Sequence, residues 1–134
     1  MQLYLWVGLG GFVGTVLRFW LSEAVASAWG ETFPWGTLII NVTGSLFIGL
    51  FATLTATEGR LMLAPDIRTI VMIGICGGYT TFSSFSLQTL NLARAGDIVA
   101  AGWNCTLSFI LCLLGVWLGF AVAQLINQFH GSLG

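Results

Sequence analysis

The chain alternates between long apolar stretches without charged residues and short polar connectors. A helix needs about 20 apolar residues to cross the hydrocarbon core of a bilayer. Three of the four charge-free stretches reach this length. The first nearly reaches it before Arg18 interrupts it. The pattern therefore predicts an all-α membrane protein with one domain over residues 1–134. Its four transmembrane helices are expected near residues 3–21, 35–57, 69–94 and 99–128.

The composition excludes several classes of soluble protein. Of the 134 residues, 57% are hydrophobic and only 7% are charged, whereas soluble domains average about 25% charged residues. A net charge of −1 gives no basic surface for nucleic acid. The connectors are too short to hold a soluble site, so the function is expected to lie within the membrane.

Catalytic chemistry is missing from the expected membrane helices. We place no Asp or Glu inside them, and we find no cluster of His, Cys and carboxylate residues. The chain is therefore not expected to be an enzyme. An exporter that couples cations to protons would need a carboxylate within the membrane, which counts against a small multidrug-type transporter.

The arginines do not favour one orientation in the membrane. Arg60 and Arg68 flank one side of the predicted bundle, and Arg18 and Arg94 flank the other. Positive residues near helix ends normally set the topology, and here they balance. Either a weak bias escapes this count, or copies insert both ways round. Four helices can hardly enclose a water-accessible path alone, so we favour an antiparallel homodimer, with the two-fold symmetry that is commonest in oligomers.

Small residues recur four positions apart in every predicted helix. Such pairs let helix backbones approach closely in membranes, so they predict tight helix contacts without chemistry. The pairs are Gly10/Gly14, Ser45/Gly49, Gly74/Gly78 and Gly115/Gly119.

The third predicted helix contains an unusual polar segment at its centre. Five of the seven residues from Thr80 to Ser86 carry hydroxyl groups, and Gly77 and Gly78 precede them. These hydroxyls could simply bond back to the preceding turn. Their density beside two glycines instead predicts a helix broken near Gly77–Thr81, and broken helices at the bilayer centre commonly mark ion sites.

Two further patterns point towards an anion. Phe82 and Phe85 are three positions apart and share a helix face. The positive edge of a phenyl ring can touch an anion without binding it tightly. On the second helix, Thr37, Asn41 and Ser45 stand four residues apart on one face. Core packing and an interhelical hydrogen bond are the simpler explanations of these two patterns.

Arg18 is a charged residue inside the first predicted span, near the end of that helix. A long Arg side chain at a helix end can reach the interface at little cost, or it could attract anions into a vestibule. Polar donors without a buried carboxylate, together with this arginine, suggest a passage for a small, strongly hydrated anion.

Three motifs together resemble the Fluc/CrcB family of fluoride channels. They are GGFVGTVLR at residues 10–18, GTLIINVTG at 36–44 and GGYTTFSSFS at 77–86. The resemblance covers essentially the whole chain. It implies an antiparallel, dual-topology homodimer with two pores in the bacterial inner membrane, through which toxic cytoplasmic fluoride leaves passively down its gradient.

The resemblance also implies roles for particular residues. Asn41 would be the pore asparagine, and Phe82 and Phe85 would offer their ring edges to fluoride. Ser83 and Ser84 would lie on the polar track.

A second group of roles concerns the broken helix and the vestibule. The backbone carbonyls of Gly77 and Thr80 would hold a structural Na+ at the dimer interface, and Arg18 would lie near the vestibule. Two positions depart from the family pattern: Thr15 replaces an alanine, and Gln88 replaces a glutamate that many members carry. A carboxylate role at position 88 is therefore not expected here.

Three hypotheses follow from these patterns. The first is a passive fluoride channel, the second a small coupled multidrug-type exporter, and the third a non-transporting membrane subunit whose polar residues only hold helices together.

Overall fold

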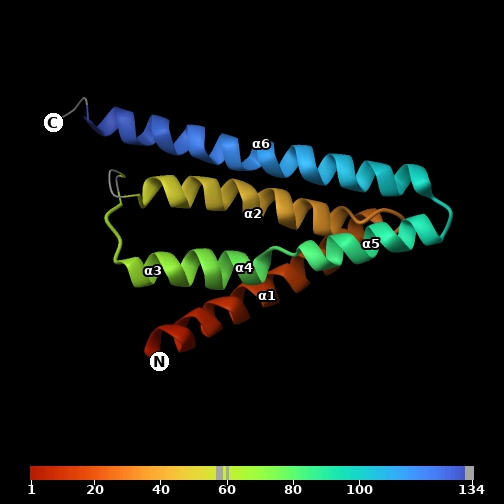
Figure 1. Cartoon of the computed structure of the whole chain (residues 1–134), viewed down its shortest axis with the longest axis horizontal. Coiled ribbons are helices and arrows are strands. Elements are labelled where there is room, and N and C mark those ends of the chain that lie inside the picture. Colours follow the sequence, from red (N-terminus) through yellow and green to blue (C-terminus); the bar gives the residue numbers. More distant parts are fainter. Residues whose placement is uncertain (57–58, 60, 132–134) are drawn as a thin grey trace.

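The computed structural model describes residues 1–56, 59 and 61–131, and within them every regular element is helical. Four helical spans are long and apolar enough to cross a membrane, which confirms the predicted all-helical, four-span architecture. Three of the spans are single helices, and the third span is composite (Figure 1). The single helices are α1 (Gln2–Trp29), α2 (Trp35–Leu54) and α6 (Ile98–Gly131).

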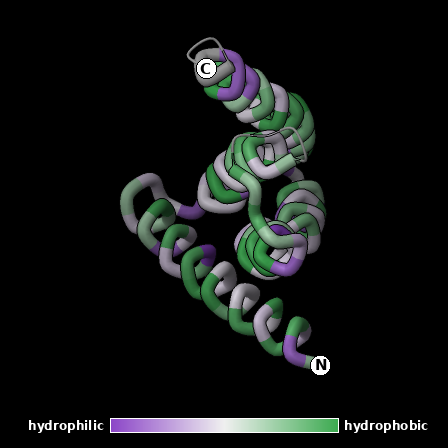
Figure 2. The backbone as a smooth tube through the Cα atoms, turned by 90° about the vertical axis from the view of Figure 1, so that its left-hand side faces the viewer, coloured by the Kyte–Doolittle hydropathy of each residue, from purple (hydrophilic) through white to green (hydrophobic). Residues whose placement is uncertain are grey.

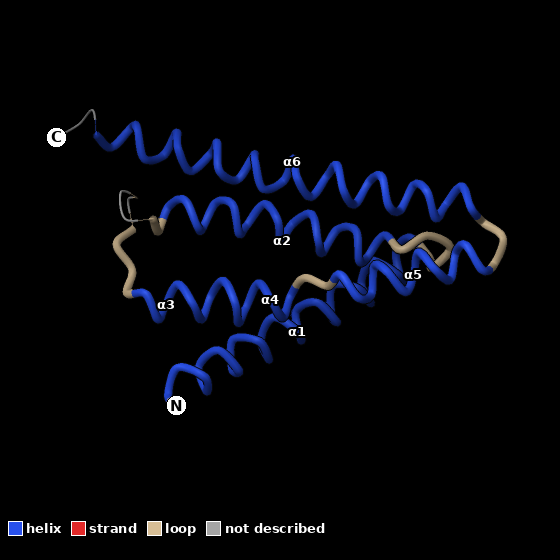
Figure 3. Tube along the Cα trace, in the orientation of Figure 1, coloured by secondary structure: helices blue, strands red, loops and turns tan. Residues whose placement is uncertain are grey.

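The third span consists of four helical pieces in line. It starts with α3 (Pro65–Thr69), continues through the π-helix η1 (Ile70–Cys76) into α4 (Gly77–Tyr79), and ends with α5 (Phe82–Arg94). Pro65 stands at the first turn, where a proline's missing N–H costs nothing. The short link between α4 and α5 is the one non-helical point along this span (Figure 3).

The link itself is Thr80 and Thr81, whose backbones are extended. Thr80 has φ −82° and ψ 158°, and Thr81 has φ −153° and ψ 112°. Helical turns on both sides therefore leave backbone groups that need partners other than the usual ones. The π-helix η1 ends at Cys76 and is separated from this link by the three residues of α4. π-Helical turns are frequent at functional sites.

α1 is longer than the predicted segment 3–21. The helix continues past Leu21 because the segment that follows is rich in Ala and contains neither Gly nor Pro. It ends at Trp29, before Gly30 with φ 79°. The end of the apolar stretch is thus not the end of the helix. Arg18 lies well inside α1 rather than at its end, and Glu23 lies within a helix, contrary to our expectation.

The remaining boundaries differ from the prediction by a few residues. The third span begins at Pro65 rather than 69, and α6 covers Ile98–Gly131 rather than 99–128. α2 ends at Leu54. Its predicted end at position 57 lies outside the described residues, as do Glu58 and Arg60.

Glycines line the two closest helix seams. α2 packs most extensively on α6, and α1 packs on η1 and α4. A Cβ added to Gly74 would lie 2.8 Å from the carbonyl oxygen of Val7, and one on Gly115 would lie 3.0 Å from that of Val42. The tight contacts predicted for the small residues are confirmed at these seams.

The two halves of the third span have different neighbours. The half before the link packs on α1, whereas α5 packs mainly on α6. Viewed along the bundle, α1 runs obliquely past the other spans (Figure 2). In the 18-residue apolar part of each span, only between 11% and 28% of the residues are buried inside the chain, so lipid or another copy must cover the rest.

Candidate functional site

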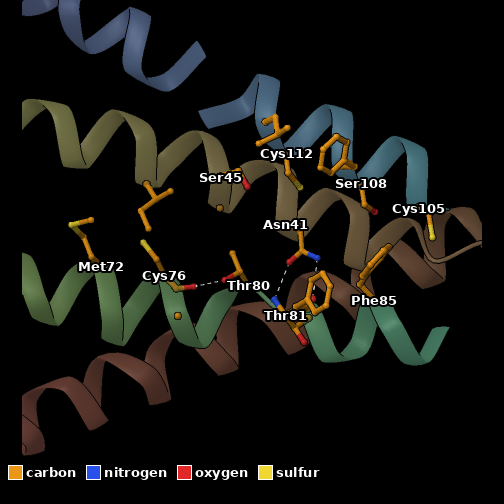
Figure 4. Close-up of a pocket in the computed structure, with 16 residues that line it drawn as sticks. Asn41, Ser45, Met72, Cys76, Thr80, Thr81, Phe85, Cys105, Ser108 and Cys112 are labelled. Carbon is orange, nitrogen blue, oxygen red and sulfur yellow. Dashed lines mark hydrogen bonds between the residues drawn. The ribbon is translucent and has the colours of Figure 1, made fainter. Parts of the chain in front are cut away.

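A groove with a volume of about 730 Å³ runs along the middle of the bundle. Its walls come from α2, the third span and α6 (Figure 4). Of the described residues that line it, none is charged. The polar ones are Asn41, Ser45, Thr80, Thr81 and Ser108, and Cys76, Cys105, Cys112, Phe82 and Phe85 are among the others.

Asn41 holds the non-helical link through both ends of its amide. Its Nδ2 donates to the carbonyl oxygen of Thr81 at 3.0 Å, and the N–H of Thr81 donates to its Oδ1 at 2.8 Å. The side chain of an α2 residue thus replaces the helical partners that Thr81 lacks. One N–H of the Asn41 amide remains, because Nδ2 carries two donors.

Thr81 also caps the start of α5. Its Oγ1 accepts from the backbone N–H of Ser84 at 3.2 Å and donates to the Ser84 hydroxyl at 3.0 Å. A Thr at this position is a favoured helix N-cap. The same hydroxyl lies 3.4 Å from that of Ser83, so Ser83 and Ser84 gather around the link as a small hydroxyl cluster.

Some hydroxyls of the segment do bond back to the preceding turn. Thr80 Oγ1 donates to the carbonyl oxygen of Cys76 at 2.9 Å, and Ser86 Oγ donates to that of Phe82 at 2.9 Å. For these two residues, a hydrogen bond to the preceding turn is therefore sufficient to explain the hydroxyl group. It does not hold for Thr81, whose hydroxyl serves the helix that follows.

Gly44 allows the link to approach α2. A Cβ on Gly44 would collide with the Thr80 side chain and lie 3.2 Å from the Tyr79 ring. The Tyr79 hydroxyl lies 2.8 Å from Thr43 Oγ1. The link is thus fixed to α2 on its Tyr79 side by Thr43 and on its Thr81 side by Asn41.

Phe82 and Phe85 form a ring pair at the start of α5. Their ring centroids are 5.3 Å apart with an interplanar angle of 50°, and both residues line the groove. Phe82 is 78% exposed, so this chain covers little of its ring. The prediction that the two rings share a face is confirmed.

The predicted stripe on α2 is divided between two cavities. Asn41 and Ser45 line the central groove, whereas Thr37 lines a separate cavity of about 410 Å³ at one end of the bundle. Thr37 is only 6% exposed. Gln88 and Asn91 also line this end cavity.

Arg18 is partly buried inside α1. The bundle contains the central groove, the end cavity at Thr37 and a third cavity at the opposite end. Arg18 lines none of them. This chain alone therefore does not bring it to the residues predicted to act with it.

Sequence reasoning gave no role to a polar pair on α6. Asn104 is 1% exposed, and its Nδ2 donates to Thr89 Oγ1 at 2.8 Å. Ser108, one turn further, lines the groove. Asn104 Oδ1 and Gln88 Oε1 are buried without a partner among the described residues. An amide inside an apolar helix is costly unless it is paired, and this cost is the signal by which the sequence could have identified Asn104.

The geometry defines a class of protein. The chain is a multi-pass helical membrane protein. The link between α4 and α5 carries hydrogen-bond donors but no charge, and it lies in a groove that Phe82 and Phe85 also line. The sequence matches the family model described as "CrcB-like protein, Camphor Resistance (CrcB)" over residues 5–120. The chain belongs to this family. It is a multi-pass integral protein of the bacterial plasma membrane.

Similar bacterial proteins share more than half of their residues with this chain. The chain is 58% identical to a protein of Opitutus terrae, and the alignment covers 98% of this chain and 100% of the relative. With a protein of Rhodospirillum rubrum it is 56%, covering 93% and 97%, and with one of Methylocella silvestris it is 54%, covering 96% and 98%. Each relative is named "Fluoride-specific ion channel FluC". These names describe ion channels, which are not a class of enzyme.

Proposed function

We propose that this protein is a fluoride-selective channel that exports cytoplasmic fluoride passively down its electrochemical gradient and so lowers cellular fluoride. The observation that carries the proposal is the identity of 54–58% with proteins named as fluoride channels, over nearly the full length of both chains. Neither coupled export nor a purely structural role has a comparable observation in its favour.

The chemistry of the groove suits a small, strongly hydrated anion. The free N–H of Asn41, which lines the groove, can replace one hydration donor. Ser83 and Ser84 do not line the groove of the single chain, and we propose that their hydroxyls act as further donors beside the link. The ring edges of Phe82 and Phe85 carry positive partial charge. No carboxylate is among the described groove-lining residues, so the walls carry no negative charge to repel the anion.

A second copy would complete the pore. The groove is only partly enclosed by its own chain, Phe82 is 78% exposed, and most residues in the apolar part of each span lack cover from their own chain. We propose an antiparallel, dual-topology homodimer in which two such grooves are closed by the partner copy, giving two fluoride pores.

A structural Na+ needs oxygen ligands, and the link offers backbone carbonyls. Among the described residues, no hydrogen bond ends on the carbonyl oxygen of Gly77 or Thr80. Unpaired carbonyls are hard oxygen ligands, the type that hard cations prefer. One chain offers two of them, so we propose that the ion binds where a second copy supplies two more.

The remaining residues would line the approach to the pore. We propose that Thr37 contributes to the mouth of the pore in the end cavity, beside Gln88 and Asn91. Arg18 would act near the vestibule only if the dimer brings it there, since it lines none of the three cavities of the single chain.

Fluoride efflux from liposomes tests the function directly. Purified protein is reconstituted in fluoride-loaded vesicles, and external fluoride is followed with an ion-selective electrode while chloride efflux is measured in parallel. Fast fluoride loss without chloride loss is expected. A folded oligomer that releases no fluoride would overturn the proposal and return the polar residues to helix packing or another substrate.

A further inference from the structure

A third cavity, of about 520 Å³, lies at the end of the bundle opposite Thr37. It forms between the C-terminal end of α2, the segment that precedes α3, and the first turns of the third span. Arg68 is the one charged residue among its described lining residues. The others are uncharged, and Thr69 and Met72 are among them.

The guanidinium of Arg68 has few partners in this cavity. Its Nε is buried and makes no hydrogen bond, and Nη2 approaches the carbonyl oxygen of Ala52 only at 3.5 Å. Among the described residues no carboxylate pairs with it, and Asp66, two positions earlier, is exposed and does not line the cavity. A guanidinium stays charged and offers five N–H donors, so most of its bonding capacity remains for water or an anion.

The Arg68 cavity adjoins the central groove through Met72. Met72 lines both the cavity and the groove, and Figure 4 shows it at one end of the groove, with Asn41 and Phe85 further along. The flexible methionine side chain can adjust to what passes beside it. An anion held at Arg68 is therefore one side chain away from the groove.

The two end cavities carry opposite charge. Glu23 and Glu31 line the cavity at Thr37, whereas Arg68 lines the cavity at the other end. An arginine in a cleft of low-dielectric walls raises the local anion concentration, and carboxylates lower it. Of the two end cavities, the one at Arg68 is therefore the one whose charge favours an anion.

We propose that Arg68 forms an anion-collecting site at one mouth of the conduction path, and that this site takes small hydrated anions such as fluoride. The inference rests on the proposed function, because a path must exist for the site to feed it. It gives Arg68, rather than Arg18, the role of the cationic group that this chain itself places beside the groove.

Fluoride efflux at two ionic strengths tests the role of Arg68. Arg68→Gln is expected to slow efflux about tenfold at low ionic strength, the lower end of the enhancement that a charged cleft gives. The difference should shrink to less than about twofold near 1 M sodium isethionate, where the Debye length is about 3 Å. Arg68→Lys, which keeps the charge, should retain most of the flux. Arg94→Gln is the matched control, because Arg94 is exposed and lines none of the three cavities.

Several results would overturn the inference. Efflux by Arg68→Gln that equals efflux by the unmodified protein at low ionic strength would do so. A deficit that does not change with ionic strength would indicate a structural role, and an equal deficit in Arg94→Gln would indicate a general charge effect.

A readout independent of transport separates this inference from the proposed function. Phenylglyoxal modifies arginine, and mass spectrometry follows its addition to Arg68, with Arg94 as the internal reference. Fluoride is expected to slow modification of Arg68 but not of Arg94. If the unmodified protein conducted no fluoride, the proposed function would fail, but protection of Arg68 would still support the anion site. Absence of protection would overturn it.

Discussion

Replacing Asn41 with alanine is expected to destabilise the link between α4 and α5. The substitution removes two hydrogen bonds, at 3.0 Å and 2.8 Å, and leaves both the N–H and the carbonyl oxygen of Thr81 without their partner. Thr81 is buried. An unpaired buried polar group costs about 1–3 kcal/mol, so the two groups together cost about 2–6 kcal/mol. Partial access of water to the groove favours the lower half of this range.

The free energy of unfolding of the reconstituted protein measures this cost, for example by reversible denaturation in mixed detergent and urea. Asn91→Ala is the matched control, because Asn91 is an exposed asparagine whose side chain makes none of the hydrogen bonds described. It should change the unfolding free energy by less than about 0.5 kcal/mol. Equal stability of Asn41→Ala and the unmodified protein would refute the reasoning, since it would mean that water alone satisfies the Thr81 backbone.

Further substitutions test other parts of the site. Phe82→Ile and Phe85→Ile should each lower fluoride efflux at least about tenfold while the oligomer stays intact, and loss of the oligomer in size-exclusion chromatography would point to packing instead. Gly78→Ala places a Cβ 2.5 Å from the Gly11 carbonyl oxygen and should cost about 1–3 kcal/mol of unfolding free energy by overpacking; an unchanged value would contradict the close seam. Gln88→Glu should make efflux fall as pH rises and the new carboxylate ionises, whereas a flat pH profile would place position 88 away from the anion. Replacing Na+ with N-methylglucamine should weaken the oligomer if a cation binds at the link, and unchanged dissociation would argue against that ion.

The sequence was sufficient for the architecture, because membrane spans depend on apolar length and on small residues at close seams. Both are local properties of the chain. The density of hydroxyls from Thr80 to Ser86 likewise pointed to the segment where Thr80 and Thr81 are extended. The pattern could not identify the hydrogen-bond partner of the Thr81 backbone. Only the three-dimensional packing shows that this partner is the side chain of Asn41, forty residues earlier.

Other features escaped the sequence for physical reasons. The end of α1 was misplaced because helix propensity continues after hydrophobicity stops. Thr37 shares a face with Asn41, but that face extends past the groove into another cavity. Asn104 was overlooked because a single amide in a long apolar stretch forms no pattern. Arg68 counted only towards topology, since its lack of a partner depends on side-chain geometry.

The two glycine seams have a consequence for how the chain is made. Each seam joins helices that are second neighbours in the chain, α1 with the third span and α2 with α6, so each pairs helices that run in the same direction. During synthesis, α1 must wait in the membrane for the third span, and α2 must wait for the last helix. The first seam therefore cannot form before the third span has been made, and the second cannot form before α6 has been made. The two closest helix contacts of the bundle thus belong to the second half of synthesis, and until then α1 has α2 as its neighbour from the same chain.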